Sequence, residues 1–221
     1  MRATFLAAMT VAAFASLTPA QAATIVPDGN FNAPLSPGAF TTYSDGNTFG
    51  PWTVGHSVDL IGSYWQAPPT GGGSVDLAGN VPGFIYQYFN AAAGTQTLNF
   101  YLAGNPDGGN PLKHMTAYVL AAGGLYSSAL SFDTTGFSKT DMGWALEGLQ
   151  FNNLGGGLIG IQFSSTDIDT PFGAVIGGIS ISAVPEPATW AMLLLGFGGI
   201  GMILRARKQV GLAFLSERLR A

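Results

Sequence analysis

The stretch that decides the fold is FIYQYFNAAAGTQTLNFYLA, residues 84–103. Its second half alternates apolar and polar side chains, so Leu98, Phe100 and Leu102 would share one face of an extended strand. A period of two indicates a β-strand with one buried face, because an amphipathic helix repeats its apolar positions every three or four residues. The stretch therefore predicts two β-strands.

The same alternation recurs in short runs on both sides of this stretch. Turn clusters rich in Gly, Pro, Asn and Asp separate the runs at residues 71–73, 105–109 and 153–157. About ten such strands predict an all-β antiparallel sandwich or jelly roll, with a β-solenoid as the alternative. A solenoid needs a repeat of fixed period, and the SVDL copies do not recur. The other readable strands begin at Trp52, Ser57, Ser74, Met115, Leu125, Ala145, Leu158 and Ala174.

The first 22 residues have the pattern of a secretory signal peptide. Arg2 supplies a positive charge, residues 5–17 are apolar, and Ala20 and Ala22 provide the small side chains that signal peptidase accepts. We predict cleavage after Ala22, with a buried N-terminal helix as the alternative. Residues 23–183 are then the exported domain.

The exported domain is acidic. It has two basic side chains, Lys113 and Lys139, against ten Asp and Glu, which is a formal net charge of −8. Binding to nucleic acid depends on Lys and Arg, so this composition excludes nucleic acid as a partner. The chain has no cysteine, which excludes disulfides, thiolate metal sites and cysteine nucleophiles. With only His56 and His114, it also lacks a histidine-rich metal site.

No residue pattern in the domain indicates catalysis, and we predict that the protein is not an enzyme. The Ser-rich stretches lack a nucleophile elbow. Most of the acidic residues stand beside Gly, Asn, Ser or Thr in expected turns, where Asp is favoured for backbone hydrogen bonding. A glycosidase with paired carboxylates is the alternative.

Tyr64, Trp65 and Gln66 are the candidate glycan-binding residues, because sugar rings stack on exposed aromatic faces beside short polar side chains. The alternative is that Tyr64 and Trp65 pack inside the sandwich. Trp52 and Trp144 are expected in the core.

Calcium is the one cofactor for which the sequence offers candidate ligands. Asn105 with Asp107, and Asp167 with Asp169, place hard oxygen atoms in expected loops. Simple turns at these positions are the alternative.

The composition changes abruptly in residues 184–208, which read VPEPATWAMLLLGFGGIGMILRARK. The prolines at the start favour an extended tether. Residues 188–204 carry no charge and predict a transmembrane helix. Trp190 would lie at one membrane interface, and Arg205, Arg207 and Lys208 would remain cytoplasmic together with the tail at residues 209–221.

This segment resembles the PEP-CTERM sorting signal. The resemblance implies recognition by a membrane-embedded exosortase and removal of the anchor near Pro185, Glu186 and Pro187. It also implies delivery to the cell surface or exopolysaccharide matrix of a Gram-negative bacterium.

The exported domain resembles the choice-of-anchor C domain, a relative of the DUF642 group. The segments that carry the resemblance are, in order, DGNF, PWTV, SVDLIGSYWQA, SVDLAG, LAGNPDGG, SFDTTG and MGW. Residues 176–179 read IGGI where that family has an acidic LDNV-type ending. The resemblance implies a galactose-binding-like β-sandwich that associates with glycans. We predict a structural or adhesive component of the exopolysaccharide matrix, with a carbohydrate-binding module as the alternative.

Overall fold

The computed structural model describes residues 25–32, 38–184, 194–201 and 205. It divides the chain into two compact units, Gln21–Val184 and a second unit of Met1–Ala20 with Pro185–Ala221. Several predicted features lie outside the described residues: the signal peptide with its cleavage site at Ala20 and Ala22, the sorting residues Pro185, Glu186, Pro187, Trp190, Arg207 and Lys208, and the tail at residues 209–221.

In the second unit, residues 194–201 and 205 are helical. Within the described ranges, no helix combines the length and the apolar character that a membrane span requires. The transmembrane helix over residues 188–204 therefore stays a prediction.

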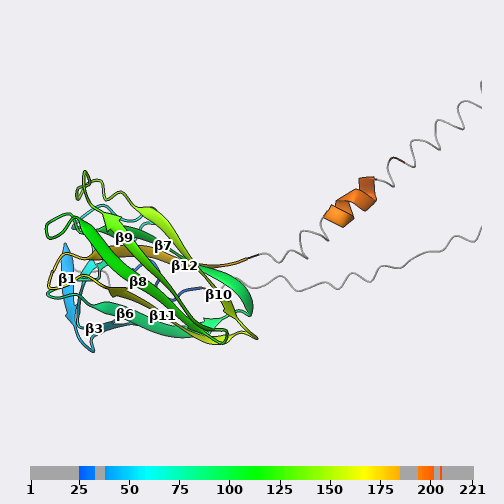
Figure 1. Cartoon of the computed structure of the whole chain (residues 1–221), viewed down its shortest axis with the longest axis horizontal. Coiled ribbons are helices and arrows are strands. Elements are labelled where there is room, and N and C mark those ends of the chain that lie inside the picture. The colour runs from blue at the N-terminus through cyan, green and yellow to red at the C-terminus, as the bar shows by residue number, and fades with distance from the viewer. Residues whose placement is uncertain (1–24, 33–37, 185–193, 202–204, 206–221) are drawn as a thin grey trace, which may run out of the picture. The chain divides into compact units, whose positions relative to one another are not determined.

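The first unit is a sandwich of two antiparallel sheets, each with six strands (Figure 1). One sheet, here sheet A, has the order β1-β4-β5-β12-β7-β10 and consists of β1 (Phe40–Ser44), β4 (Ser57–Ile61), β5 (Ser74–Asp76), β12 (Ala174–Ala183), β7 (Gly94–Gly104) and β10 (Ala145–Asn153). Sheet B has the order β2-β3-β6-β11-β8-β9 and consists of β2 (Thr48–Phe49), β3 (Trp52–Gly55), β6 (Phe84–Ala91), β11 (Gly157–Ser165), β8 (Leu112–Ala121) and β9 (Gly124–Asp133).

The predicted all-β sandwich is confirmed, and each of the ten strands read from the sequence is present as one of β3 to β12. The chain changes sheet at most connections, as in a jelly roll. The short strands β1 and β2 were not predicted, because neither has an alternating apolar run long enough to identify it.

The core lies between the two sheets and is made by the inward face of each strand. Leu98, Phe100 and Leu102 of β7 are all buried, as their spacing predicts. Trp52 is completely buried and its Nε1 donates a hydrogen bond to the carbonyl of Asp28 at 3.1 Å. Trp144, also expected in the core, is only half-buried and packs against the edge of the core.

Residues 25–32 form part of the core rather than a loose terminus. Phe31 is 1% exposed, and its ring packs 5.5 Å from the ring of Trp52. The carbonyls of Pro27 and Gly29 accept hydrogen bonds from Gln87 Nε2 and from the backbone of Ile179. Residues 25–32 thus join the two sheets.

Strand β12 has a bulge at the position where the sequence departs from the choice-of-anchor C pattern. The pairing of β12 with β7 shifts register between Gly177 and Ser180, and Gly178 has a φ of +59°. A Cβ atom at Gly178 would collide with the hydroxyl of Thr70 and the ring of Tyr101. The bulge therefore requires glycine both for its backbone conformation and for its space.

We predict that Gly178→Ala lowers the free energy of unfolding by about 3 kcal/mol, through strain and collision together. Gly46→Ala is the matched control, because Gly46 also has a positive φ, +76°, but no atom lies within 4 Å of its would-be Cβ. Gly46→Ala should lower the free energy of unfolding by only about 1 kcal/mol. Denaturant unfolding of the two variants would measure the difference, and equal losses would contradict a steric role for the bulge.

Candidate functional site

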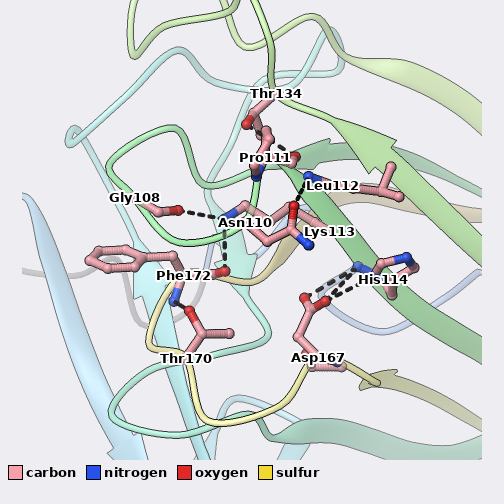
Figure 2. Close-up of polar contacts among 11 residues, drawn as sticks. Gly108, Asn110, Pro111, Leu112, Lys113, His114, Thr134, Asp167, Thr170 and Phe172 are labelled. Carbon is pink, nitrogen blue, oxygen red and sulfur yellow. Dashed lines mark hydrogen bonds and ion pairs between the residues drawn. The ribbon is translucent and has the colours of Figure 1, made fainter.

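The described residues of the sandwich line several surface hollows, of which three bear on function. One of them, here the loop-end hollow, has a volume of about 520 Å³. It lies between the start of β8 and the loop at residues 166–173 that joins β11 to β12 (Figure 2). Its lining residues are Asn110, Lys113, His114, Thr166, Asp167, Ile168, Thr170 and Phe172.

Lys113 forms the base of the loop-end hollow and is only 1% exposed. Its ammonium group donates to the carbonyls of Gly108 at 2.6 Å and of Phe172 at 3.0 Å (Figure 2). Burial lowers the pKa of Lys113, while the negative charges of Asp76 and Asp167 raise it. Lys113 thus clamps the β7–β8 loop, residues 105–111, to the β11–β12 loop.

His114 and Asp167 form one wall of this hollow. Both carboxylate oxygens of Asp167 accept from the backbone N–H of His114, at 3.1 and 3.2 Å. The same carboxylate lies 3.0 Å from His114 Nδ1 (Figure 2). The loop is therefore fixed to β8, and the acceptor capacity of Asp167 is largely used inside the protein.

Behind both loops, Asp76 of β5 is fully buried in a polar network. Its carboxyl accepts from Asn105 Nδ2 at 2.6 Å and from the backbone N–H groups of Ala78 and Gly173 at 2.9 and 3.0 Å. Burial, helped by the neighbouring charge of Asp59, raises the pKa of Asp76 to about 8, against the effect of these donors. The network ties β5 to the loops on either side.

A second hollow, of about 230 Å³, brings together several residues that the sequence singled out. Tyr64, Trp65, Asn105 and Asp107 all line it. Tyr64 donates its hydroxyl proton to Asp107 Oδ2 at 2.7 Å, and Lys139 donates to Tyr64 at 2.7 Å and pairs with Asp107 at 3.0 Å. These polar groups are satisfied by one another.

Two of the three candidate glycan-binding residues, Trp65 and Gln66, have structural roles in the fold. Trp65 is only 7% exposed and donates from Nε1 to Ser74 Oγ at 2.9 Å, so it packs in the core and offers no open stacking face. Gln66 supports the loop after β9, because its side chain accepts from the backbone of Met142 at 2.8 Å. Tyr64 is half-buried and keeps a place on the wall of the hollow.

The calcium candidates do not gather into one cluster. Asn105 is engaged with Asp76 and with the backbone of Asp107, Asp107 is paired with Lys139, and Asp169 is exposed. In the part of the chain that the structure describes, no group of three or more His, Asp or Glu side chains is placed to hold a metal ion. Calcium binding stays a prediction.

The third hollow lies on the outer face of sheet B, and the sequence did not point to it. It has a volume of about 250 Å³ and no charged lining residue. Its lining residues, here the tyrosine face, are Tyr86, Tyr88, Tyr118, Leu120, Leu125, Gly160, Ile161 and Gln162.

Cross-strand register assembles this face. Gln162 of β11 pairs with Tyr86 of β6 on one side and with Tyr118 of β8 on the other. Gly160 pairs with Tyr88, whose ring lies so close that a Cβ at Gly160 would be 2.6 Å from its Cε1 atom. The glycine therefore lets the ring rest on the backbone of β11, while Tyr88 as a whole stays 60% exposed.

One signal in the sequence could have revealed this face. In β6, Ile85, Gln87 and Phe89 point inward and are buried, so Phe84, Tyr86 and Tyr88 must point outward. Aromatic residues at three consecutive outward positions of one strand are unusual for a solvated surface. The partners on β8 and β11 could not be read from the sequence, since they depend on strand register.

Residues 183–208 match the family model of the PEP-CTERM protein-sorting motif. The chain carries a PEP-CTERM sorting motif. The resemblance noted at these residues is thus confirmed, and the motif marks an exported protein sorted to the cell surface and implies processing by an exosortase. A comparison with curated proteins finds no match.

Among solved structures, the chain is similar to a family 35 carbohydrate-binding module from Clostridium thermocellum, with 19% identity, coverage of 66% of this chain and 100% of that one, and a TM-score of 0.43. It is also similar to a family 61 module in complex with β-1,4-galactotriose, with 15% identity, coverage of 72% and 98%, and a TM-score of 0.43. Neither likeness assigns a ligand to this chain.

The buried carboxyl of Asp76 predicts a pH dependence of stability. Its pKa of about 8 in the folded state exceeds the ordinary value of 3.8, so the folded protein holds a proton that the unfolded chain releases. The free energy of unfolding should therefore fall as pH rises from about 4 to about 8. Asp59, whose pKa burial also raises, acts in the same direction.

Denaturant unfolding at pH 5 and pH 8 would measure this dependence, and Asp76→Asn, which cannot ionise, should show a much smaller difference between the two. Equal stability of the unaltered protein at both pH values would contradict the prediction.

Proposed function

We propose that the protein is a non-enzymatic, surface-sorted carbohydrate-binding protein whose tyrosine face binds a neutral polysaccharide. The single observation that carries this proposal is the uncharged hollow on sheet B, lined by three tyrosines from two strands with Gln162 between them. An exposed aromatic patch of this kind on a folded domain marks an interaction surface.

The chemistry of the tyrosine face suits a sugar. Aromatic rings stack on the apolar faces of sugar rings, while phenol hydroxyls and a side-chain amide bond to sugar hydroxyls. Among the described residues, none makes a hydrogen bond with the Gln162 side-chain amide, so this amide can bond to a sugar hydroxyl. With no charge in the hollow, a neutral glycan is favoured over an anionic one.

The aromatic side chains also form a row rather than a single contact point. Along β6, the ring centroids of Phe84 and Tyr86 are 6.2 Å apart, and those of Tyr86 and Tyr88 are 5.9 Å apart. The row supports binding of several consecutive sugar units along an extended chain. A free monosaccharide would use only part of it.

The carboxylates give no support to the glycosidase alternative. Asp59 and Asp76 are paired across β4 and β5, but Asp76 is fully buried and out of reach of a substrate. Asp107 is neutralised by Lys139. Asp59 and Asp107 both line the hollow of about 230 Å³, but Asp59 accepts from the Thr42 hydroxyl at 2.6 Å and Asp107 is held by Tyr64 and Lys139.

We predict that Tyr88→Ala and Tyr86→Ala each weaken binding to a neutral matrix polysaccharide about tenfold, because truncating a central aromatic contact costs more than about 1 kcal/mol. Affinity electrophoresis through gels containing the extracted polysaccharide would measure the change. Both side chains are partly exposed, so the fold should survive.

Tyr101→Ala is the matched control. Tyr101 is a half-buried tyrosine on the outer face of the opposite sheet, in β7. Retardation that falls equally in the control and in the Tyr88 variant would refute the tyrosine face as the binding site.

The sorting motif supports a role at the cell surface, and glycan binding there would make the protein an adhesive component of the exopolysaccharide matrix of a Gram-negative bacterium. Processing near Pro185 would leave the sandwich whole. The β12 pairing with β7 continues through Ala183, and the backbone of Val184 donates to Thr95 at 3.0 Å. Removal of everything after Val184 would therefore take no residue from the sheet.

We predict that changing Pro185, Glu186 and Pro187 to alanine leaves export intact but blocks removal of the anchor, because an exosortase reads this tripeptide. The precursor should accumulate in the inner membrane. Fractionation and gel mobility of an epitope-tagged chain in the native host would follow both forms. Normal processing of the triple-alanine chain would refute exosortase recognition at this site.

A further inference from the structure

The loop-end hollow contains a buried positive charge that no carboxylate pairs with directly. Lys113 is one of the two basic side chains in the acidic exported domain, and it is 1% exposed. Among the described residues, no carboxylate oxygen lies within 4.0 Å of its ammonium group. Removing such a charge from water is costly unless a counter-charge compensates it.

The polar groups that remain available in this hollow are mainly donors. The Oδ1 atom of Asn110 accepts a hydrogen bond from the backbone N–H of Leu112 at 3.1 Å. The amide N–H groups of Asn110 therefore remain available to a ligand. Thr170 uses its oxygen to accept from the backbone of Phe172 at 3.1 Å, which leaves its hydroxyl proton. Both residues line the hollow (Figure 2).

His114 adds a third group. Its Nδ1 atom is 3.0 Å from Asp167, and its Nε2 atom has no partner among the described residues. The His114 side chain is 43% exposed, so a ligand can reach it. In the neutral tautomer that donates from Nδ1 to Asp167, the Nε2 atom is an acceptor, which suits a hydroxyl group of a sugar.

We propose that the loop-end hollow is a second, independent binding site for a carboxylate-bearing sugar, that is, a uronic acid unit. Asn110, His114 and Thr170 would contact the ligand, and Lys113 would attract it from beneath through its charge. The donors of Asn110 and Thr170, in a hollow that also contains the buried ammonium, match the acceptor atoms of a carboxylate, and His114 Nε2 can accept from a sugar hydroxyl. At about 520 Å³, the hollow has room for the sugar ring.

This site differs in chemistry from the tyrosine face. The face on sheet B has no charged residue, whereas the loop-end hollow contains a lysine. The two sites would let one domain hold both neutral and acidic units of a matrix polysaccharide. The inference stands even if the tyrosine face binds nothing.

The two histidines of the chain provide a direct test. The full-length protein, labelled with ¹³C on its histidine rings and held in detergent, is titrated with sodium glucuronate, glucose, sodium acetate or sodium chloride. We expect glucuronate to shift the ring signal of His114 and to leave that of His56 in place, because His56 lies at the end of β3 outside the hollow. Glucose and sodium chloride should shift neither signal.

Asn110→Asp is the decisive variant, because it keeps the oxygen that accepts from Leu112 while replacing the donor with a negative charge. It should weaken glucuronate binding at least tenfold. Asn90→Asp, which adds the same charge at an exposed residue that lines none of the three hollows, should not. Tyr88→Ala should leave the His114 shift unchanged.

Three results would overturn the proposal. The first is that glucuronate does not move the His114 signal, and the second is that glucose shifts this signal by the same amount. The third is that acetate binds as tightly as glucuronate, because the site would then not recognise a sugar. Loss of the shift in Tyr88→Ala would mean that the two sites are not independent.

Discussion

A strand of a sandwich that has no cover on its outer face buries only one of its two faces, and in this protein β6 is such a strand with large side chains on both faces. Ile85, Gln87 and Phe89 fill the core, so the aromatic residues between them are forced outward. The outward row lies on a sheet whose neighbouring strand offers glycine at Gly160, which allows a ring to lie on the backbone. The tyrosine face is thus a consequence of how the core is filled.

The loop end of the sandwich depends on a second constraint, the need to satisfy buried polar groups. Asp76 and Lys113 are both buried, and each is held by atoms of the loops that surround it. Their partners include the backbone of Gly173 and the carbonyl of Phe172, neighbours on the β11–β12 loop. These contacts keep the loop-end hollow in shape.

Both ends of the exported domain are integrated into the sheets. Phe31 near the start is packed against Trp52, and Val184 at the end is still hydrogen-bonded to β7. A signal peptide that ends at Ala22 and a processing site at Pro185 would bracket the folded residues closely. Export and sorting would then act on short segments outside the sandwich, and the mature domain would lose nothing that stabilises it.

The sequence alone determined the all-β class, ten of the strands and the sorting motif, because each of these depends on a local pattern. The alternation of Leu98, Phe100 and Leu102 is visible within five consecutive positions of the chain. Likewise, the sorting motif is one contiguous segment, residues 183–208.

Only the tertiary structure decided where the sites lie. It placed Trp65 in the core, where its Nε1 atom meets Ser74, although an exposed position was equally compatible with the local sequence. It also brought Gln162 between Tyr86 and Tyr118, which are 32 positions apart in the chain, and set Lys113 beneath the β11–β12 loop. These placements follow from strand register and loop packing, in which residues distant in sequence are paired by the fit of the whole core.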